Sequence, residues 1–275
     1  MIHPRLSVSQ ASSIAWPIEK DLELWAATGI RDVALLLRKI DEAAGRIGGR
    51  AAAVRMLADA GLRVDNLAIG PCFELARPAQ WEEGRDRIRA SLAVARALGS
   101  RCVVITTGGP GGLGWDEAAD ALAAAIAPVV EEARRDGFEL AVENTNGLRY
   151  DISFATTLRD TVDLARRIGL GVCMEVNNVW CERGLERTIA ANADLFRMVQ
   201  VNDFVVGTFQ TPDRAVPGDG DIPLRRILAA LRDAGYRGFF ELEIVGPRIE
   251  AEGYARAIPR SLEFLAGVLR DLGIA

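Results

Sequence analysis

The residues best suited to chemistry are acids and amides that interrupt buried apolar runs. Glu175 stands in the apolar segment 171–180, GVCMEVNNVW, and Asn177 and Asn178 follow it. Burying a bare carboxylate is costly, so Glu175 must be hydrogen-bonded, protonated or bound to a cation. The segment is therefore either the floor of an active site or a core strand with a satisfied acid.

Three neighbouring apolar runs also carry oxygen-bearing side chains near their ends. Glu241 and Glu243 in the last run are two residues apart, so both face the same side of a strand. A single acid of this kind is more often paired with a nearby arginine, but the same pattern in four successive runs favours an active site. The side chains concerned are Glu143, Asn144, Glu175, Gln200, Asn202, Asp203, Glu241 and Glu243.

Eight short apolar runs predict β-strands that alternate with longer amphipathic, helical segments. The predicted strands are 5–10, 32–37, 62–69, 102–107, 138–143, 171–176, 196–202 and 239–245. Glycine suits the left-handed position that closes a helix, and a glycine ends many of the helical segments. These glycines are Gly29, Gly61, Gly99, Gly137, Gly169 and Gly235.

The spacing of these glycines predicts the fold. They recur at intervals of 32 or 38 residues, and the last interval of 66 corresponds to two units. With the first unit and the last helix added, the chain holds eight strand–helix units. Eight such units close into a parallel (β/α)8 TIM barrel, an α/β fold that would form a single domain over residues 1–275. A doubly wound open sheet is the alternative, but it normally has fewer strands, and no GxGxxG motif follows the first strand.

The composition excludes several classes of function. A net charge of -5 and a pI near 5.2 argue against a nucleic-acid partner. His3 is the only histidine, which nearly excludes a histidine base. Lys20 and Lys39 are the only lysines, so there is little room for a Schiff-base mechanism. The four cysteines form no CxxC pair and are expected to be buried free thiols.

The location of the protein is expected to be cytoplasmic. The first residues, MIHPRLSVSQ, lack the basic and apolar regions of a signal peptide. No apolar run reaches the length of a membrane span, so no membrane partner is expected.

Two irregular segments follow predicted strands, where a barrel places its substrate loops. Gly108–Gly114, GGPGGLG, is either an anion cradle formed by backbone N–H groups or a plain flexible loop. Phe204–Gly220 is the longest irregular segment and a candidate lid.

Five motifs carry a resemblance to a known family. They are LAVEN at 140–144, MEVNN at 174–178, VQVND at 199–203, DRAVPGDGDI at 213–222 and GYRGFFELE at 235–243. On these motifs the chain resembles the xylose isomerase-like barrel superfamily, which includes sugar phosphate isomerases and epimerases. The resemblance covers nearly the whole chain. It implies a TIM barrel that acts on a small-molecule substrate and could form a homo-oligomer.

The resemblance also implies a metal-assisted site. Relatives hold one divalent cation at the ends of strands five to eight, where this chain has Glu143, Glu175, Gln200 and Glu243. Glu143 and Glu243 match the two glutamates that move the proton. Substrate contacts are expected from Asn146, Asn178, Trp180 and Arg214.

Four of these positions depart from the family pattern. Glu175 replaces the usual aspartate, and Asn146, Asn178 and Gln200 stand where histidines are common. An all-oxygen set suits Mg²⁺ or Mn²⁺ better than zinc and would bind the ion more weakly. The expected cofactor is therefore Mg²⁺ or Mn²⁺, and loss of the metal is the alternative.

The expected activity is isomerisation or epimerisation of a ketose-like or hydroxy-ketone substrate by proton abstraction next to a carbonyl. Two alternatives stay open. One is a lyase or dehydratase of the same superfamily, since Trp180, Phe204 and Phe209 would suit a ring. The other is a metal-free barrel that only binds a ligand.

Overall fold

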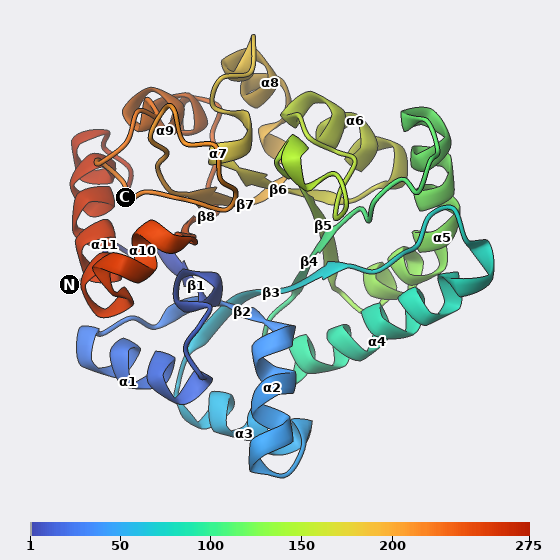
Figure 1. Cartoon of the computed structure of the whole chain (residues 1–275), viewed down its shortest axis with the longest axis horizontal. Helices are drawn as coiled ribbons and strands as arrows, with labels where there is room; N and C mark the ends of the chain where they lie inside the picture. Colours follow the sequence, from blue (N-terminus) through green and yellow to red (C-terminus); the bar gives the residue numbers. More distant parts are fainter. Residues whose placement is uncertain (1) are drawn as a thin grey trace.

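Eight parallel strands pair in chain order from β1 to β8 and back to β1, and so close into a barrel (Figure 1). The computed structural model describes residues 2–275. The strands are β1 (Leu6–Ser9), β2 (Asp32–Leu36), β3 (Arg63–Pro71), β4 (Cys102–Thr106), β5 (Glu139–Glu143), β6 (Gly171–Glu175), β7 (Phe196–Val201) and β8 (Phe239–Leu242). Each overlaps the run predicted for it. The (β/α)8 fold is therefore confirmed, and the open-sheet alternative is wrong.

Helices follow the strands and form a ring around the barrel (Figure 1). The longer helices are α1 (Ile18–Thr28), α2 (Leu37–Ile47), α3 (Arg50–Asp59), α4 (Trp81–Ala97), α5 (Trp115–Arg135), α6 (Leu158–Ile168), α8 (Leu185–Asn192), α9 (Leu224–Asp233) and α11 (Tyr254–Asp271). The short ones are α7 (Val176–Val179) and α10 (Pro247–Glu252), with 3₁₀ turns η1 (Gln10–Ser13), η2 (Pro78–Gln80), η3 (Gly147–Arg149) and η4 (Ala193–Leu195). All six glycines predicted to end helical segments are left-handed, with φ between 66° and 81°.

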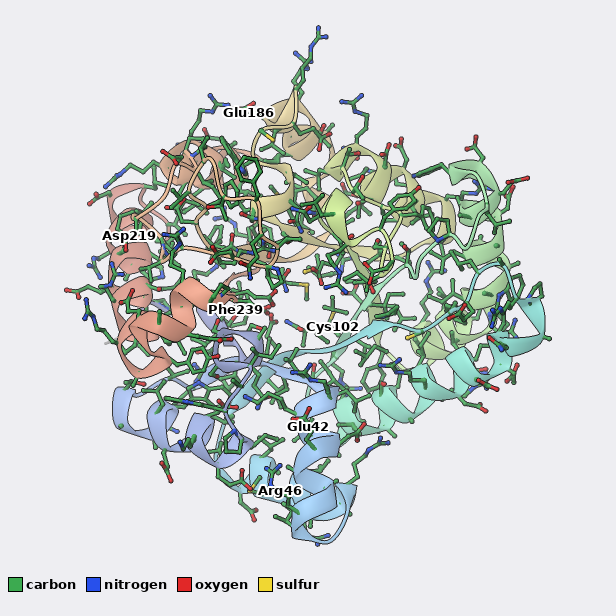
Figure 2. All side chains as sticks on the ribbon, in the orientation of Figure 1. Glu42, Arg46, Cys102, Glu186, Asp219 and Phe239 are labelled. Atoms are coloured by element: carbon green, nitrogen blue, oxygen red, sulfur yellow. The ribbon has the colours of Figure 1, made fainter. Side chains whose placement is uncertain are left out.

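Apolar residues form two separate cores. The larger core packs outward-facing strand residues such as Val33 and Leu242 against the helices. The smaller core lies inside the barrel and contains Cys102, which Figure 2 shows near the centre of the ring. Its members are Ala68, Cys102, Val104, Ala141, Cys173 and Met198.

The next inward layer along the strands is polar. Side chains alternate along a strand, so residues two positions after a member of the inner core also face the barrel axis. On β5, β6 and β7 those residues are Glu143, Glu175 and Gln200. The change from apolar to polar therefore falls at the carboxyl ends of the strands, where barrel enzymes place their active sites.

The two ends of the chain lie on the same side of the molecule, next to α11 (Figure 1). Nε2 of His3 lies 3.0 Å from the backbone oxygen of Ile274. Burial lowers the pKa of His3. The single histidine thus joins the chain ends and takes no part in the candidate site.

All four cysteines are free, as expected, but they differ in exposure. Cys102 and Cys173 are buried, and Cys72 is partly exposed. Cys181 is exposed, because it lies in the turn after α7, so the expectation that it is buried is wrong. Within residues 2–275, no helix is both long enough and apolar enough to cross a membrane.

Candidate active site

A cavity of about 470 Å³ opens at the carboxyl ends of the strands. Glu175 is fully buried beside it, with Oε1 3.9 Å from Nη2 of Arg214 on the cavity wall. Trp180 does not line this cavity but packs against the larger core. Six other predicted site residues line the wall: Glu143, Asn146, Asn178, Gln200, Arg214 and Glu243.

Strand pairing explains why these side chains meet. Glu175 on β6 pairs with Gln200 on β7, which in turn pairs with Glu241 on β8. Glu143 ends β5, the next strand around the barrel, and Glu243 directly follows β8. Inward-facing residues at similar heights in a closed barrel converge near its axis.

Glu243 is held by side chains from two other strands. Its Oε2 accepts hydrogen bonds from Oγ of Ser9 at 3.0 Å and from Nε2 of Gln200 at 2.9 Å. Burial, with the charge of Glu175 as a second cause, raises the pKa of Glu243 to about 7, although Arg214 and Ser9 lower it. Glu243 can therefore take up and release a proton near neutral pH.

Glu143 faces the same cavity and has a pKa well above its ordinary value. Burial is the main cause, and the charges of Glu243 and Glu175 add to it, whereas Arg214 lowers the pKa. Glu143, which releases its proton less readily than an ordinary glutamate, and a partly ionised Glu243 line one cavity, an arrangement suited to acid–base chemistry.

Glu175 is fixed through one oxygen only. Its Oε1 accepts hydrogen bonds from the backbone N–H of Asn177 and from Nδ2 of Asn202, each at 2.8 Å. Its Oε2 is buried without a hydrogen-bond partner among residues 2–275. Burial raises the pKa of Glu175, while Arg214 lowers it. A buried oxygen left without a donor is costly, so it points to a ligand that would supply one or to a cation.

Glu241 fixes the orientation of Gln200. Its two oxygens accept hydrogen bonds from Nδ2 of Asn66 at 2.6 Å and from Nε2 of Gln200 at 3.2 Å. Nε2 of Gln200 thus faces two carboxyl groups, those of Glu241 and Glu243. Oε1 of Gln200 is buried and has no partner in the described part of the chain. Gln200 therefore offers an acceptor, and not a donor, to a ligand.

The oxygen atoms of this site are of the kind that bind a hard divalent cation. Oε2 of Glu175 and Oε1 of Gln200 lack partners, and the charge of Glu243 raises the pKa of Glu143. A cation would satisfy both oxygens and relieve the repulsion. Across residues 2–275, however, no three or more His, Cys, Asp or Glu side chains are grouped closely enough to hold a metal ion. Cation binding would therefore require the carboxylates to close in.

Asn146 and Asn178 line the cavity with their side-chain amides already bonded, and Oδ1 of Asn178 accepts a hydrogen bond from Nδ2 of Asn177 at 3.4 Å. Oδ1 of Asn146 accepts a hydrogen bond from the backbone N–H of Leu148 at 2.9 Å. Nδ2 of Asn178 donates to the backbone oxygen of Asn144 at 3.2 Å. These bonds hold both side chains on the wall.

The candidate lid, 204–220, is anchored at its base by Asp203. The carboxylate of Asp203 accepts hydrogen bonds from the backbone N–H groups of Phe204, Gly218 and Ile222 at 2.8–3.0 Å. Asp203 therefore has a structural role. Phe209 is 93% exposed, and neither it nor Phe204 lines the cavity. The role of a lid stays a prediction.

Close packing accounts for two glycines of the segment 108–114. A Cβ at Gly108 would lie 2.4 Å from the backbone oxygen of Phe73, and one at Gly109 would lie 2.7 Å from that of Asp151. The segment borders a second cavity of about 470 Å³. Close packing thus explains Gly108 and Gly109, and an anion cradle in this segment stays a prediction.

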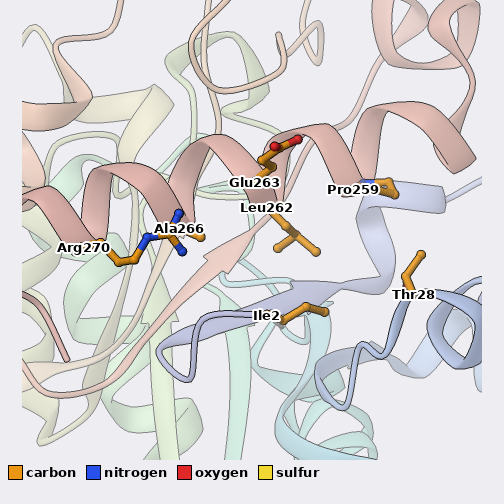
Figure 3. Close-up of a pocket in the computed structure, with 7 residues that line it drawn as sticks. All are labelled: Ile2, Thr28, Pro259, Leu262, Glu263, Ala266 and Arg270. Atoms are coloured by element: carbon orange, nitrogen blue, oxygen red, sulfur yellow. The ribbon is translucent and has the colours of Figure 1, made fainter.

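A further cavity, of about 340 Å³, lies beside α11 (Figure 3). Its lining residues are Ile2, Thr28, Pro259, Leu262, Glu263, Ala266 and Arg270. Glu263 is the one acidic residue among them and Arg270 the one basic residue, so this wall offers no pair of acids. The cavity at the strand ends is the better candidate for acid–base chemistry.

The structure adds residues to the site that the sequence did not single out. Ser9 could have been found, because Leu6 and Val8 alternate with Ser7 and Ser9 in the first run. The other additions are three arginines on the cavity wall. They come from helices and turns. Side chains there do not alternate between two faces as they do along a strand, so the sequence does not show which way they point. These are Arg38, Arg87 and Arg149.

The fold and the site together define a TIM barrel with acids at the carboxyl ends of its strands. Residues 22–267 match the family described as the xylose isomerase-like TIM barrel, and the chain belongs to that family. The resemblance found in the motifs is thereby confirmed. No curated protein sequence matches the chain.

Three solved structures illustrate the likeness. Protein SMc04130 from Sinorhizobium meliloti 1021 is 25% identical, with a TM-score of 0.83 and 98% of each chain covered. The IOLI protein, solved with a binding zinc atom, is 16% identical, with a TM-score of 0.84 over 98% of this chain and 99% of that one. D-psicose 3-epimerase, solved in the presence of D-fructose, is 17% identical, with a TM-score of 0.71 and 97% of each chain covered. The last two likenesses show the shared fold alone.

Proposed function

We propose that this protein is an isomerase or epimerase acting on a ketose-like or hydroxy-ketone substrate. The reaction would be proton abstraction next to a carbonyl, with Glu143 and Glu243 as the acid–base pair. The observation that carries the proposal is that both acids line one cavity and have raised pKa values, that of Glu243 being about 7. Family membership supports it, because a D-psicose 3-epimerase has the same fold.

The two acids would have different roles. Near neutral pH, Glu243 is partly ionised and takes the proton from the carbon next to the carbonyl. Glu143, whose pKa is strongly raised when no cation is bound, returns a proton to the other carbon or the other face. Arg214 is buried and its Nε has no partner among the described residues, so its guanidinium can stabilise the negative charge that develops on the substrate oxygen.

A divalent cation, Mg²⁺ or Mn²⁺, is part of the proposal. Glu143, Glu175, Gln200 and Glu243 would hold it, and when bound it would polarise the substrate carbonyl. Support comes from the unpaired oxygens of Glu175 and Gln200 and from the zinc atom in the structure of the IOLI protein.

Deuterium exchange tests the proposed reaction. Short hydroxy-ketones and ketoses are incubated with the protein in D₂O, and loss of the proton next to the carbonyl is followed by NMR. Glu143→Gln and Glu243→Gln are each expected to slow exchange of an accepted compound by roughly 10²–10⁴-fold. Glu139→Gln is the matched control, because Glu139 begins β5, the strand that Glu143 ends, and pairs with Arg197. Exchange that persists unchanged in both site variants would rule the proposal out.

A lyase is the second candidate, favoured by the apolar part of the cavity wall. A fully hydroxylated sugar needs polar partners along its length, whereas much of this wall offers none. Its apolar residues include Ile14, Leu36, Ile69, Ile152 and Val245. Elimination would begin with the same proton abstraction. An unsaturated product in the deuterium experiment would identify it.

A further inference from the structure

We propose that the substrate carries an anionic group, a carboxylate or a phosphate, and that Arg38 and Arg87 bind it. The inference rests on the proposed function, because it concerns the same cavity, and it adds the chemical class of the substrate.

The cavity wall is basic although the chain is acidic. The whole chain has 38 Asp and Glu residues against 33 Lys and Arg residues. On the cavity wall the balance is reversed, because Glu143 and Glu243 are its only acids. Arg149 is paired with Asp151, and Arg214 with Glu175. Arg38 and Arg87 are therefore the arginines of the wall best able to attract an anion. The basic residues of the wall are Arg38, Arg87, Arg149 and Arg214.

Arg87 is fixed in position while its charge is not neutralised. Its Nη2 donates to the backbone oxygen of Ile69 at 2.7 Å and its Nη1 to that of Pro71 at 2.9 Å. These carbonyls hold the guanidinium at the end of β3. Within residues 2–275 no carboxylate forms a salt bridge with it. An anion in the cavity would be the first full negative charge to pair with it.

Arg38 lies in the first turn of α2, where the helix meets the cavity. This turn contains no acidic residue, and no side chain caps it, so its free N–H groups add to the charge of Arg38. Arg38 approaches Glu42 at 3.3 Å, but both side chains are more than half exposed. Such a pair is weak, so Arg38 can turn to an anion in the cavity.

The two arginines lie on a different part of the cavity wall from the acids. In the closed ring of eight strands, β3 and β5 are two strands apart, and so are β2 and β8. Arg38 and Arg87 follow β2 and β3, whereas Glu143 ends β5 and Glu243 follows β8. Arg214 is the arginine that lowers the pKa of both acids. A substrate can therefore place its reacting carbon at the acids and its anionic group at Arg38 and Arg87.

Calorimetric titration with three probes of one carbon skeleton tests this inference: glycerol 3-phosphate, glycerate and glycerol. We expect saturable binding of at least one anion and none of glycerol, and the preferred anion identifies the group. Arg38→Gln and Arg87→Gln should each weaken binding about tenfold. Arg87→Lys, which keeps the charge, should retain more affinity than Arg87→Gln. Arg46→Gln is the control, since Arg46 lies on α2, pairs with Glu19 and lies away from the barrel centre (Figure 2).

Three results would overturn the inference. They are glycerol binding as tightly as the anions, no saturable binding of either anion, and unchanged affinity in Arg38→Gln protein that melts like the wild type. The experiment measures binding and not turnover, so its result can be distinguished from a test of the proposed reaction. A protein that binds an anion but exchanges no proton would contradict the proposed function only. One that exchanges the proton of a neutral ketose and ignores both anions would contradict this inference only.

Discussion

The role of each acid in the barrel follows from the donors that reach it and from its access to the cavity. Asp203 receives three backbone N–H groups and serves as a structural anchor. Glu241 receives two side-chain amides and orients Gln200. Glu243 receives one hydroxyl and one amide, and it also faces the cavity. Of these three acids, only Glu243 both faces the cavity and has a pKa near neutral pH.

Ser9→Ala tests the hydroxyl on Glu243. The hydroxyl donates to the carboxylate and lowers its pKa, so its loss should raise the pKa of Glu243 further. If Glu243 acts as the base, the rising limb of the pH–rate profile moves to higher pH, and exchange at pH 6 falls roughly two- to tenfold. Ser261→Ala in α11 is the control, because its hydroxyl bonds only to the helix backbone. A profile that does not move would show that Ser9 leaves the base unaffected.

The sequence could predict which acids reach the site but not what each one does. The position of each acid relative to the predicted strand ends was enough to predict that Glu143, Glu175 and Glu243 lie close together. The distinction between Glu241 and Glu243 depends on Asn66, a residue of β3 that pairing brings near only in the closed barrel. Such partners lie more than a hundred residues away in the chain, so no local pattern reveals them.

Among the elements, the helix ends were the most predictable. Glycine at a left-handed position is required by local backbone sterics, and this is why the spacing of Gly29, Gly61 and their equivalents indicated eight units. The tertiary loops were not predictable in the same way. The segment 108–114 was expected to be an anion cradle or a flexible loop, whereas Gly108 and Gly109 allow close approach to Phe73 and Asp151.

Gly29→Ala and Gly45→Ala form a matched pair that tests the helix-stop argument. A Cβ at either position meets nothing within 4 Å, so packing does not contribute. Gly29 has φ of 74°, and alanine there should cost roughly 1–2 kcal/mol of unfolding free energy. Gly45 lies inside α2, where alanine should stabilise by about 0.4–1 kcal/mol. Denaturant melts measure both, and equal effects would refute the argument.

At the scale of the whole molecule, several buried acids make stability depend on pH. Burial raises the pKa of Glu143, Glu175, Glu241 and Glu243, so the folded protein holds these protons more tightly than the unfolded chain. For Glu243, the stabilisation is fully present below pH 4.5 and is lost as the pH rises through about 7.

Chelator-treated protein should therefore lose stability between pH 4.5 and pH 7. The part due to Glu243 is on the order of 1–3 kcal/mol, and Glu243→Gln should flatten the curve in this window. Denaturant melts across the pH range measure both curves. An equally steep curve for the variant would contradict the assignment to Glu243.

Direct titration of the carboxyl groups tests most closely whether Glu143 and Glu243 form an acid–base pair. Glutamate labelled with ¹³C at the carboxyl carbon is followed by NMR against pH in chelator-treated protein. One signal should titrate near pH 7 and be missing in Glu243→Gln, and the signal missing in Glu143→Gln should titrate well above the ordinary range of a glutamate. If both signals titrate near pH 4.5, the ordinary value for glutamate, the pair does not exist and the proposed function is wrong.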